Sequence, residues 1–158
     1  MGIKNYIEQK HRLKDVDYMQ VALEVAAQAK SNGDLPIAAV LVWAGGMQIV
    51  EHDTRYSDRN PLNHAVINVI NKTTSTLNRR LSDATLYCTL EPDLLCALAI
   101  KAAGIKEVVF GSYDYKDGFI SSKVFDHNLL EITAMGGVLG LECCNMLPDS
   151  MQDRLRYE

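Results

Sequence analysis

The feature that most constrains the fold is an uninterrupted apolar run, Pro36-Ile37-Ala38-Ala39-Val40-Leu41-Val42-Trp43. A segment with no polar side chain has no face for water, and such runs are typical of strands buried within a sheet. The run therefore predicts a buried strand. Ala44-Gly45-Gly46 then turns the chain, and residues 47–52 are expected to return as the second strand of a hairpin.

Helices and strands alternate around this hairpin. Apolar residues at helical spacing between Tyr18 and Ala29 predict a preceding helix, which Ser31-Asn32-Gly33 ends. Beyond the hairpin, capping residues, prolines and apolar runs predict the remaining elements. These are a helix from Asn60-Pro61 to about Asn71, a strand over 84–89, a helix from Glu91-Pro92 to about Ala102 closed by Gly104, strands over 107–111 and 137–141, and a closing helix over 142–156.

This order of elements predicts an α/β fold with three layers. A five-stranded mixed sheet would lie in the middle, with helices on both faces. A chain of 158 residues has the length of one domain, so residues 1–158 are expected to form a single domain. Residues 1–14 are polar and charged, and we interpret them as an N-terminal arm or a short first helix.

Charge and cysteine usage argue against several classes of protein. The formal net charge of -4 argues against a large nonspecific nucleic-acid surface, although it leaves a local basic pocket open. The four cysteines form no regular framework and the first residues contain no apolar signal segment, so a reduced, cytoplasmic protein is expected. No apolar run approaches the roughly 20 residues that cross a membrane.

Two of the expected helix starts carry side chains suited to a metal ion. Asn63-His64-Ala65-Val66 opens one helix, and Glu91-Pro92-Asp93-Leu94-Leu95-Cys96 opens the other. His64, Asp93 and Cys96 are residue types that ligate zinc, and three protein ligands with one open position are typical of catalytic zinc. Each also has a simpler interpretation: a polar cap for His64, a first-turn dipole residue for Asp93, and a small buried side chain for Cys96.

These motifs, together with residues 34–42, 83–92, 106–111 and 139–143, resemble the cytidine/deoxycytidylate deaminase superfamily. Its signature is His-x-Glu followed by Pro-Cys-x-x-Cys. The similarity runs from about residue 17 to about residue 147, and it is greatest to bacterial tRNA-specific adenosine deaminases and guanine deaminases. The resemblance implies a cytidine deaminase-like fold, zinc held by His64, Asp93 and Cys96, and substrate contacts at Asp53 and Ala65. It also implies a base, nucleoside or tRNA as ligand, and pairing as a homodimer or with a related deaminase.

The chain departs from the family's pattern at positions that carry the chemistry. Val66 stands where the family has the Glu that moves protons between the zinc-bound water, the ring and the departing amine. Asp93 replaces the first cysteine, although zinc also accepts carboxylate oxygen. Asp53 stands where relatives have an Asn that contacts the base. Glu91 is a candidate replacement for the missing shuttle, but relatives that keep the shuttle also carry this Glu, so a structural role is favoured.

The sequence therefore predicts a deaminase-family protein that lacks normal deaminase activity and binds a base, a nucleotide or a protein partner. An active deaminase with a rewired His/Asp/Cys zinc site remains an alternative, as does a noncatalytic partner subunit of an active deaminase. The noncatalytic subunit of the eukaryotic heterodimeric tRNA adenosine deaminase similarly has Val in place of the Glu. A protein that binds no small ligand is a third alternative. The other cysteines, Cys88, Cys143 and Cys144, are expected to be packing residues.

Overall fold

A computed structural model describes residues 3–121 and 130–156 of the chain. In chain order the elements are α1 (Ile3–Ser31), β1 (Ala38–Trp43), the short 3-10 helix η1 (Ala44–Gly46), β2 (Met47–His52), α2 (Ala65–Leu77), β3 (Thr85–Leu90), α3 (Leu94–Ala103), β4 (Glu107–Asp114), β5 (Thr133–Met135), α5 (Gly140–Met146), α6 (Asp149–Gln152) and β6 (Leu155–Arg156).

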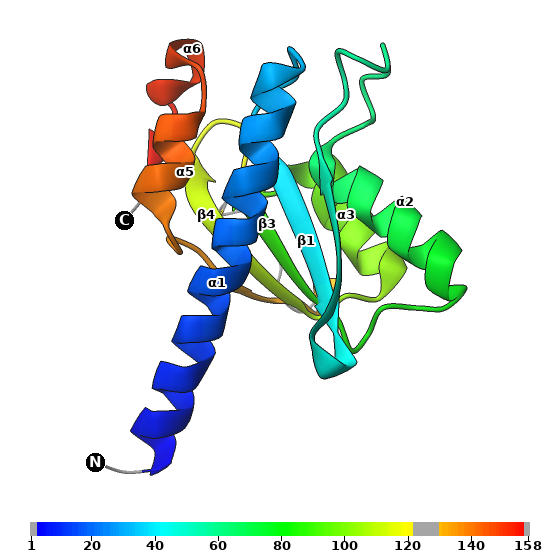
Figure 1. Ribbon diagram of the computed structural model, residues 1–158, viewed down its shortest axis with the longest axis vertical. Coiled ribbons are helices and arrows are strands. Elements are labelled where there is room, and N and C mark those ends of the chain that lie inside the picture. The colour runs from blue at the N-terminus through cyan, green and yellow to red at the C-terminus, as the bar shows by residue number, and fades with distance from the viewer. Residues whose placement is uncertain (1–2, 122–129, 157–158) are drawn as a thin grey trace.

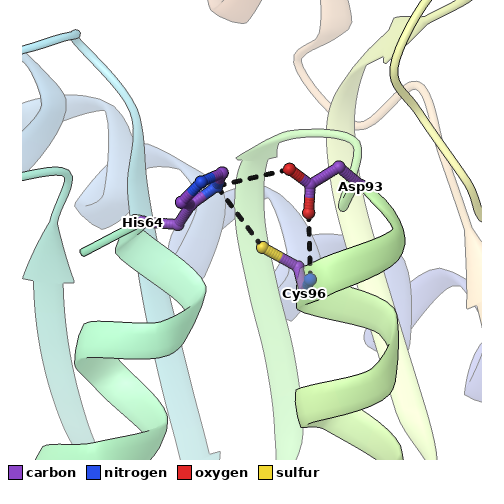
Figure 2. Close-up of side chains that lie close together, drawn as sticks. All are labelled: His64, Asp93 and Cys96. Atoms are coloured by element: carbon purple, nitrogen blue, oxygen red, sulfur yellow. Dashed lines mark hydrogen bonds and ion pairs between the residues drawn. The ribbon is translucent and has the colours of Figure 1, made fainter. Parts of the chain in front are cut away.

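The sheet is mixed, as predicted. Its main path runs β2-β1-β3-β4-β5, and β6 adds to β4. The strand β1 is antiparallel to both of its neighbours, whereas β3, β4 and β5 are parallel. Because parallel neighbours need a crossover connection, α3 lies between β3 and β4 in the sequence and packs against the sheet. The starts of α2 and α3 consequently lie at the same end of the sheet (Figure 2).

Two hydrophobic cores cover the two faces of the sheet, which confirms the three-layer architecture. In β1, Ala39 and Leu41 contribute to the core beneath α2 and α3. Ala38, Val40 and Val42 point to the other face and pack with α1 and α5. The two pairs of helices lie on opposite sides of the strands (Figure 1). Burial on both faces explains why β1 has no polar residue.

The N-terminal segment is one continuous helix. Residues 3–14, which we interpreted as an arm or a separate short helix, belong to α1, and α1 ends at Ser31 where the sequence placed its end. The first turns of α1 extend beyond the end of the sheet (Figure 1). Among the described residues, no helix is long and apolar enough to cross a membrane.

The start of α2 differs from the prediction. Asn60-Pro61 does not open the helix, because Asn60 Oδ1 accepts the N–H of Leu62 at 3.0 Å and forms a local turn instead. The helix begins at Ala65, which makes His64 its N-cap residue. It also continues beyond Asn71 to Leu77, where Asn78 takes a left-handed conformation and ends it.

The C-terminal prediction was wrong in two respects. Residues 137–141 are not a strand, because Gly137 and Leu139 have φ values of 87° and 49°, which extended backbone does not permit. The fifth strand is Thr133–Met135. The single closing helix over 142–156 is also wrong. Pro148 separates α5 from α6, and the chain then forms β6.

Candidate metal centre and ligand pocket

The start of α3 supplies two candidate ligands on a well-defined turn. Asp93 is the N-cap residue, and its Oδ1 accepts the backbone N–H of Cys96 at 2.9 Å. This bond satisfies one of the N–H groups that a helix start leaves without a partner. It also holds the Asp93 carboxylate above the Cys96 side chain, with Oδ2 directed away from the helix (Figure 2).

The start of α2 brings His64 to face this pair. His64 Nδ1 lies 3.4 Å from Asp93 Oδ2 and 3.7 Å from Cys96 Sγ. One ligand atom from each of the three residues lies within 4.8 Å of the others. The three side chains converge on one point between the two helix starts (Figure 2). The structure thus brings together the three metal ligands proposed from the sequence.

The two separations that involve His64 fit a zinc ion, and the third is within 4.8 Å. Zinc bonds of about 2.0–2.3 Å to N, O and S in a tetrahedron place neighbouring ligand atoms roughly 3.3–3.8 Å apart. The distances of 3.4 and 3.7 Å around His64 Nδ1 fall within that range. His64, Asp93 and Cys96 would hold the ion, and zinc with one open position polarises a water or a ligand oxygen.

The Cys96 thiol depends on a cation to ionise. Burial first, and then the neighbouring Asp93 carboxylate, raise the pKa of this thiol far above its ordinary value. Without a metal the group is therefore a neutral thiol, because a thiolate would be both desolvated and close to another negative charge. Coordination to a divalent cation reverses this preference and deprotonates the thiol.

The pocket beside the cluster is small, with a volume of about 80 Å³. Ligand pockets are commonly about 300–1,000 Å³. Ala65 and Val66, the first two residues of α2, line its wall and are 1% and 4% exposed. The Val66 side chain is part of the core between α2, α3 and the sheet. An aliphatic surface therefore occupies the place where the family has its proton-transferring Glu.

Asp53 also lines the pocket, but the backbone and side chain of Arg55 already occupy both of its oxygens. Asp53 is fully buried. Its Oδ1 accepts the backbone N–H of Arg55 at 3.0 Å, and its Oδ2 accepts from Arg55 Nε and Nη2, each at 2.8 Å. The Arg55 Nη1 atom lies 3.4 Å from His64 Nε2. Arg55 was not identified from the sequence, and the Asp-x-Arg spacing at the end of a strand is the only local signal for it.

Four further residues line the pocket: Glu91 directly after β3, Asp114 and Asp117 at and beyond the end of β4, and Arg154 before β6. Glu91 accepts the backbone N–H groups of Asp114 and Ser121 at 2.9 and 2.6 Å, which explains its burial and supports the structural role favoured from the sequence. Asp114 Oδ1 accepts two backbone N–H groups at 3.1 Å, and its Oδ2 pairs with Arg154 Nη2 at 3.0 Å. Arg154 Nη1 also pairs with Asp117 at 2.8 Å. No local sequence pattern marks Arg154 as a pocket residue, because the pairing of β6 with β4 brings it there.

The remaining cysteines are packing residues, as predicted. Cys88, Cys143 and Cys144 are all buried and unpaired by disulfides. Burial is the largest factor that raises the pKa of the Cys88 and Cys143 thiols, so both are neutral. Among the described residues, His64, Asp93 and Cys96 form the only group with the composition and proximity of a metal site.

The fold and this cluster define the class of protein. Residues 12–112 match the family model for the cytidine and deoxycytidylate deaminase zinc-binding region. The chain therefore belongs to the cytidine and deoxycytidylate deaminase family, and within it resembles the tRNA adenosine deaminases. It is 35% identical over 142 residues to the tRNA-specific adenosine deaminase of Bacillus subtilis (strain 168), which covers 85% of this chain and 86% of the relative. It is 38% identical over 157 residues to that of Haemophilus influenzae, with coverage of 89% and 84%.

Solved structures agree with this assignment. A structure from a study of A-to-I editing by tRNA:A34 deaminases superimposes with a TM-score of 0.76 at 32% identity, covering 83% of this chain and 99% of that one. The guanine deaminase of Nitrosomonas europaea superimposes with a TM-score of 0.69 at 22% identity, covering 83% and 81% of the two chains. The second likeness shows the fold alone. Together they confirm the cytidine deaminase-like architecture expected from the sequence.

Proposed function

We propose that this protein is a metal-binding member of the deaminase family that binds a nucleobase and lacks normal hydrolytic deaminase activity when it acts alone. The observation that carries the proposal is Val66. Its side chain is buried at the first turn of α2, beside the metal cluster, and has no proton to give or accept. A general acid/base contributes about 10²–10⁴-fold to a reaction, and deamination needs several proton transfers.

The other carboxylates of the pocket support the same proposal, because each already has partners. Asp53 is held by Arg55, Glu91 by two backbone N–H groups, and Asp114 by Arg154 and two backbone N–H groups. Asp93 has one oxygen on the helix start and the other at the metal cluster. None of these groups is placed as a replacement proton shuttle.

The first test is the zinc content of the full chain, purified without added metal or chelator. About one zinc per chain supports the His64, Asp93 and Cys96 site. Deamination of adenine, guanine and cytosine compounds is then assayed, and we expect none above background. Turnover by the lone wild-type chain would overturn the proposal and favour a rewired active site.

A double variant tests the chemical reason directly. Val66→Glu with Asp93→Cys restores the family's signature, and we expect tighter zinc binding and measurable deamination in assays where the wild type has none. The matched control is Leu95→Glu with Asp93→Cys, which adds the same charge on the exposed second residue of α3. If the first variant binds no zinc, the location of the site is wrong.

A second candidate function is that of a noncatalytic subunit paired with another copy or with an active relative. Leu94 and Leu98 of α3 are each 51% exposed, and they lie one helical turn apart. Leu62, which precedes α2, is 56% exposed. Exposed apolar side chains grouped on a helix are typical of contact surfaces. We expect a dimer in light-scattering chromatography, and a monomer for Leu94→Glu with Leu98→Glu. A monomeric wild type would leave only the heterodimer, which co-purification with an active relative then tests.

A further inference from the structure

The pocket beside the candidate metal site has hydrogen-bond donors to spare but few free acceptors. Its buried acceptors are already used, since Asp53, Glu91 and Asp114 each accept bonds at both oxygens. Its donors are not. The Arg55 side chain is 25% exposed and lines the cavity. A guanidinium has five N–H groups and no acceptor.

The bonds of Arg55 can be counted. Asp53 takes the Nε hydrogen and one Nη2 hydrogen, at 2.8 Å each. The Nη1 atom has one contact, at 3.4 Å, with His64 Nε2. Since a terminal guanidinium nitrogen carries two hydrogens, Nη1 and Nη2 each keep one that these contacts do not use. Both hydrogens are on the positively charged Arg55 guanidinium, which the buried Asp53 carboxylate holds at the wall of the pocket.

We propose that Arg55 makes this pocket select the oxo form of a heterocyclic base over the amino form. The inference rests on the base-binding function proposed above. Adenine, cytosine and guanine present an amino group, which donates, whereas hypoxanthine, uracil and xanthine carry a carbonyl at the same position, which accepts. A carbonyl oxygen can accept a charge-assisted hydrogen bond from Arg55. An amino group at this place would bring one donor against another and would offer the Arg55 hydrogens no acceptor.

This preference is the reverse of what a working deaminase needs, since the amino base is the substrate and the oxo base is the product. It is consistent with a valine at position 66, because a protein that performs no turnover need not release the oxo form. The small volume of the pocket, about 80 Å³, leaves room for one edge of a base beside Arg55 and excludes large substituents on that edge. The chain would then act as a binder of deaminated bases.

The test is a set of affinities measured by calorimetry on the full chain with its metal content recorded. The probes are three matched pairs: adenine and hypoxanthine, cytosine and uracil, guanine and xanthine. In at least one pair we expect the oxo base to bind about tenfold or more tightly, the effect of one good charge-assisted hydrogen bond. A ring nitrogen next to the exchanged group also changes from acceptor to N–H in each of these pairs, so a variant is needed to show that Arg55 causes the preference.

The variant that tests the role of Arg55 is Arg55→Gln with Asp53→Asn. It replaces a charged pair by a neutral one, so that no buried carboxylate is left without a partner. We expect the ratio of affinities within the pair to fall to near one. Arg59→Gln, on the exposed part of the same loop, is the control and should keep the wild-type ratio. A melting curve for each variant shows that it is folded.

The outcomes separate the two proposals. If no base binds, the base-binding function fails and this inference fails with it. If bases bind but the amino form is equal or tighter, the inference is wrong and base binding stands. If the oxo form is tighter and the double variant keeps that preference, Arg55 is only the structural partner of Asp53 and the inference is again wrong.

Discussion

The starts of α2 and α3 meet at the candidate metal site, but different kinds of contact hold their side chains in place. Asp93 caps α3 through its own side chain, and the same turn carries Cys96. His64 is the N-cap of α2 and makes no such side-chain bond to its helix. Its ring is instead bordered by Arg55 at Nε2 and by the α3 ligands at Nδ1. One half of the site is therefore fixed by local structure, and the other half by tertiary contacts.

This difference indicates how the site responds to change. We expect the α3 half to keep its geometry with or without a metal, because the Asp93 cap forms without one. The α2 half has no equivalent bond. Its His64 can also use its two nitrogens in alternative ways: a hydrogen bond from Arg55 needs Nε2 as an acceptor, whereas a metal at Nδ1 leaves the proton on Nε2. The Arg55 bond and the metal therefore compete for His64.

We expect the largest difference in stability between two matched variants, each of which places a carboxylate at the second residue of its helix. Val66→Glu buries a charge without a partner and should destabilise the metal-free protein by roughly 3 kcal/mol. Leu95→Glu occupies the same position on α3, where the side chain is exposed, and should change stability by less than about 0.5 kcal/mol. Urea unfolding with chelator present measures both. Equal effects would show that the two helix starts are equivalent after all.

The next effect concerns the ligands themselves. His64→Ala and Cys96→Ala should each weaken zinc binding by roughly 100-fold or more, since each removes a direct ligand. In the metal-free protein they should differ. His64→Ala is expected to change stability by less than about 1 kcal/mol because its ring caps no N–H, and Cys96→Ala to cost about 1 kcal/mol or more of core packing. Competition with a chelating dye measures affinity, and thermal melts measure stability.

A smaller effect should separate the two roles of Asp93. Asn is as good an N-cap as Asp, so Asp93→Asn should keep the stability of the metal-free protein and lose zinc affinity. Asp93→Ala should lose both, with a stability cost of about 1 kcal/mol. The pair is compared in thermal melts with and without zinc. If Asp93→Asn retains wild-type zinc affinity, the carboxylate is a cap alone.

The smallest effect is an acid-dependent loosening of the loop before α2. Asp34 accepts the backbone N–H groups of Tyr56 and Ser57, at 3.2 and 2.9 Å. Burial raises the pKa of Asp34, but the bonds from Ser57 and Tyr56 outweigh it and lower the pKa below 3.8. Its stabilising contribution is thus present above that value and is lost as the pH falls through the folded-state pKa. Asp34→Asn should therefore take up fewer protons on acid unfolding, by at most one, which stability curves between pH 2 and 5 would reveal.

Local sequence signals predicted the parts of the fold that depend on local causes. The apolar run of β1, the Gly-Gly turn after it and the Gly104 stop of α3 each act through their own residues. The start of α2 was misplaced because Asn60 has two uses, a helix cap or a local turn, and only the surrounding loop selects one. The C-terminal segment was misplaced because its apolar pattern does not reveal left-handed backbone at Leu139.

The candidate site divides in the same way. His64, Asp93 and Cys96 could be singled out because they stand in recognisable helix-start motifs. Arg55 and Arg154 could not, because their roles come from contacts with Asp53, Asp114 and Asp117 that only the folded chain brings about. Charged side chains on loops are usually solvated. The Asp-x-Arg spacing is the only local mark of Arg55, and no neighbouring residue marks Arg154.

Because the Asp93 carboxylate caps α3 and also faces the candidate metal site, the structure of this turn does not depend on the supply of metal. A cysteine in its place would make a stronger ligand and a poorer helix start, so such a protein would depend on zinc to hold that turn together. Here the turn is complete before any ion arrives. If zinc binds His64, Asp93 and Cys96, this helix start would therefore need no refolding when the ion is gained or lost.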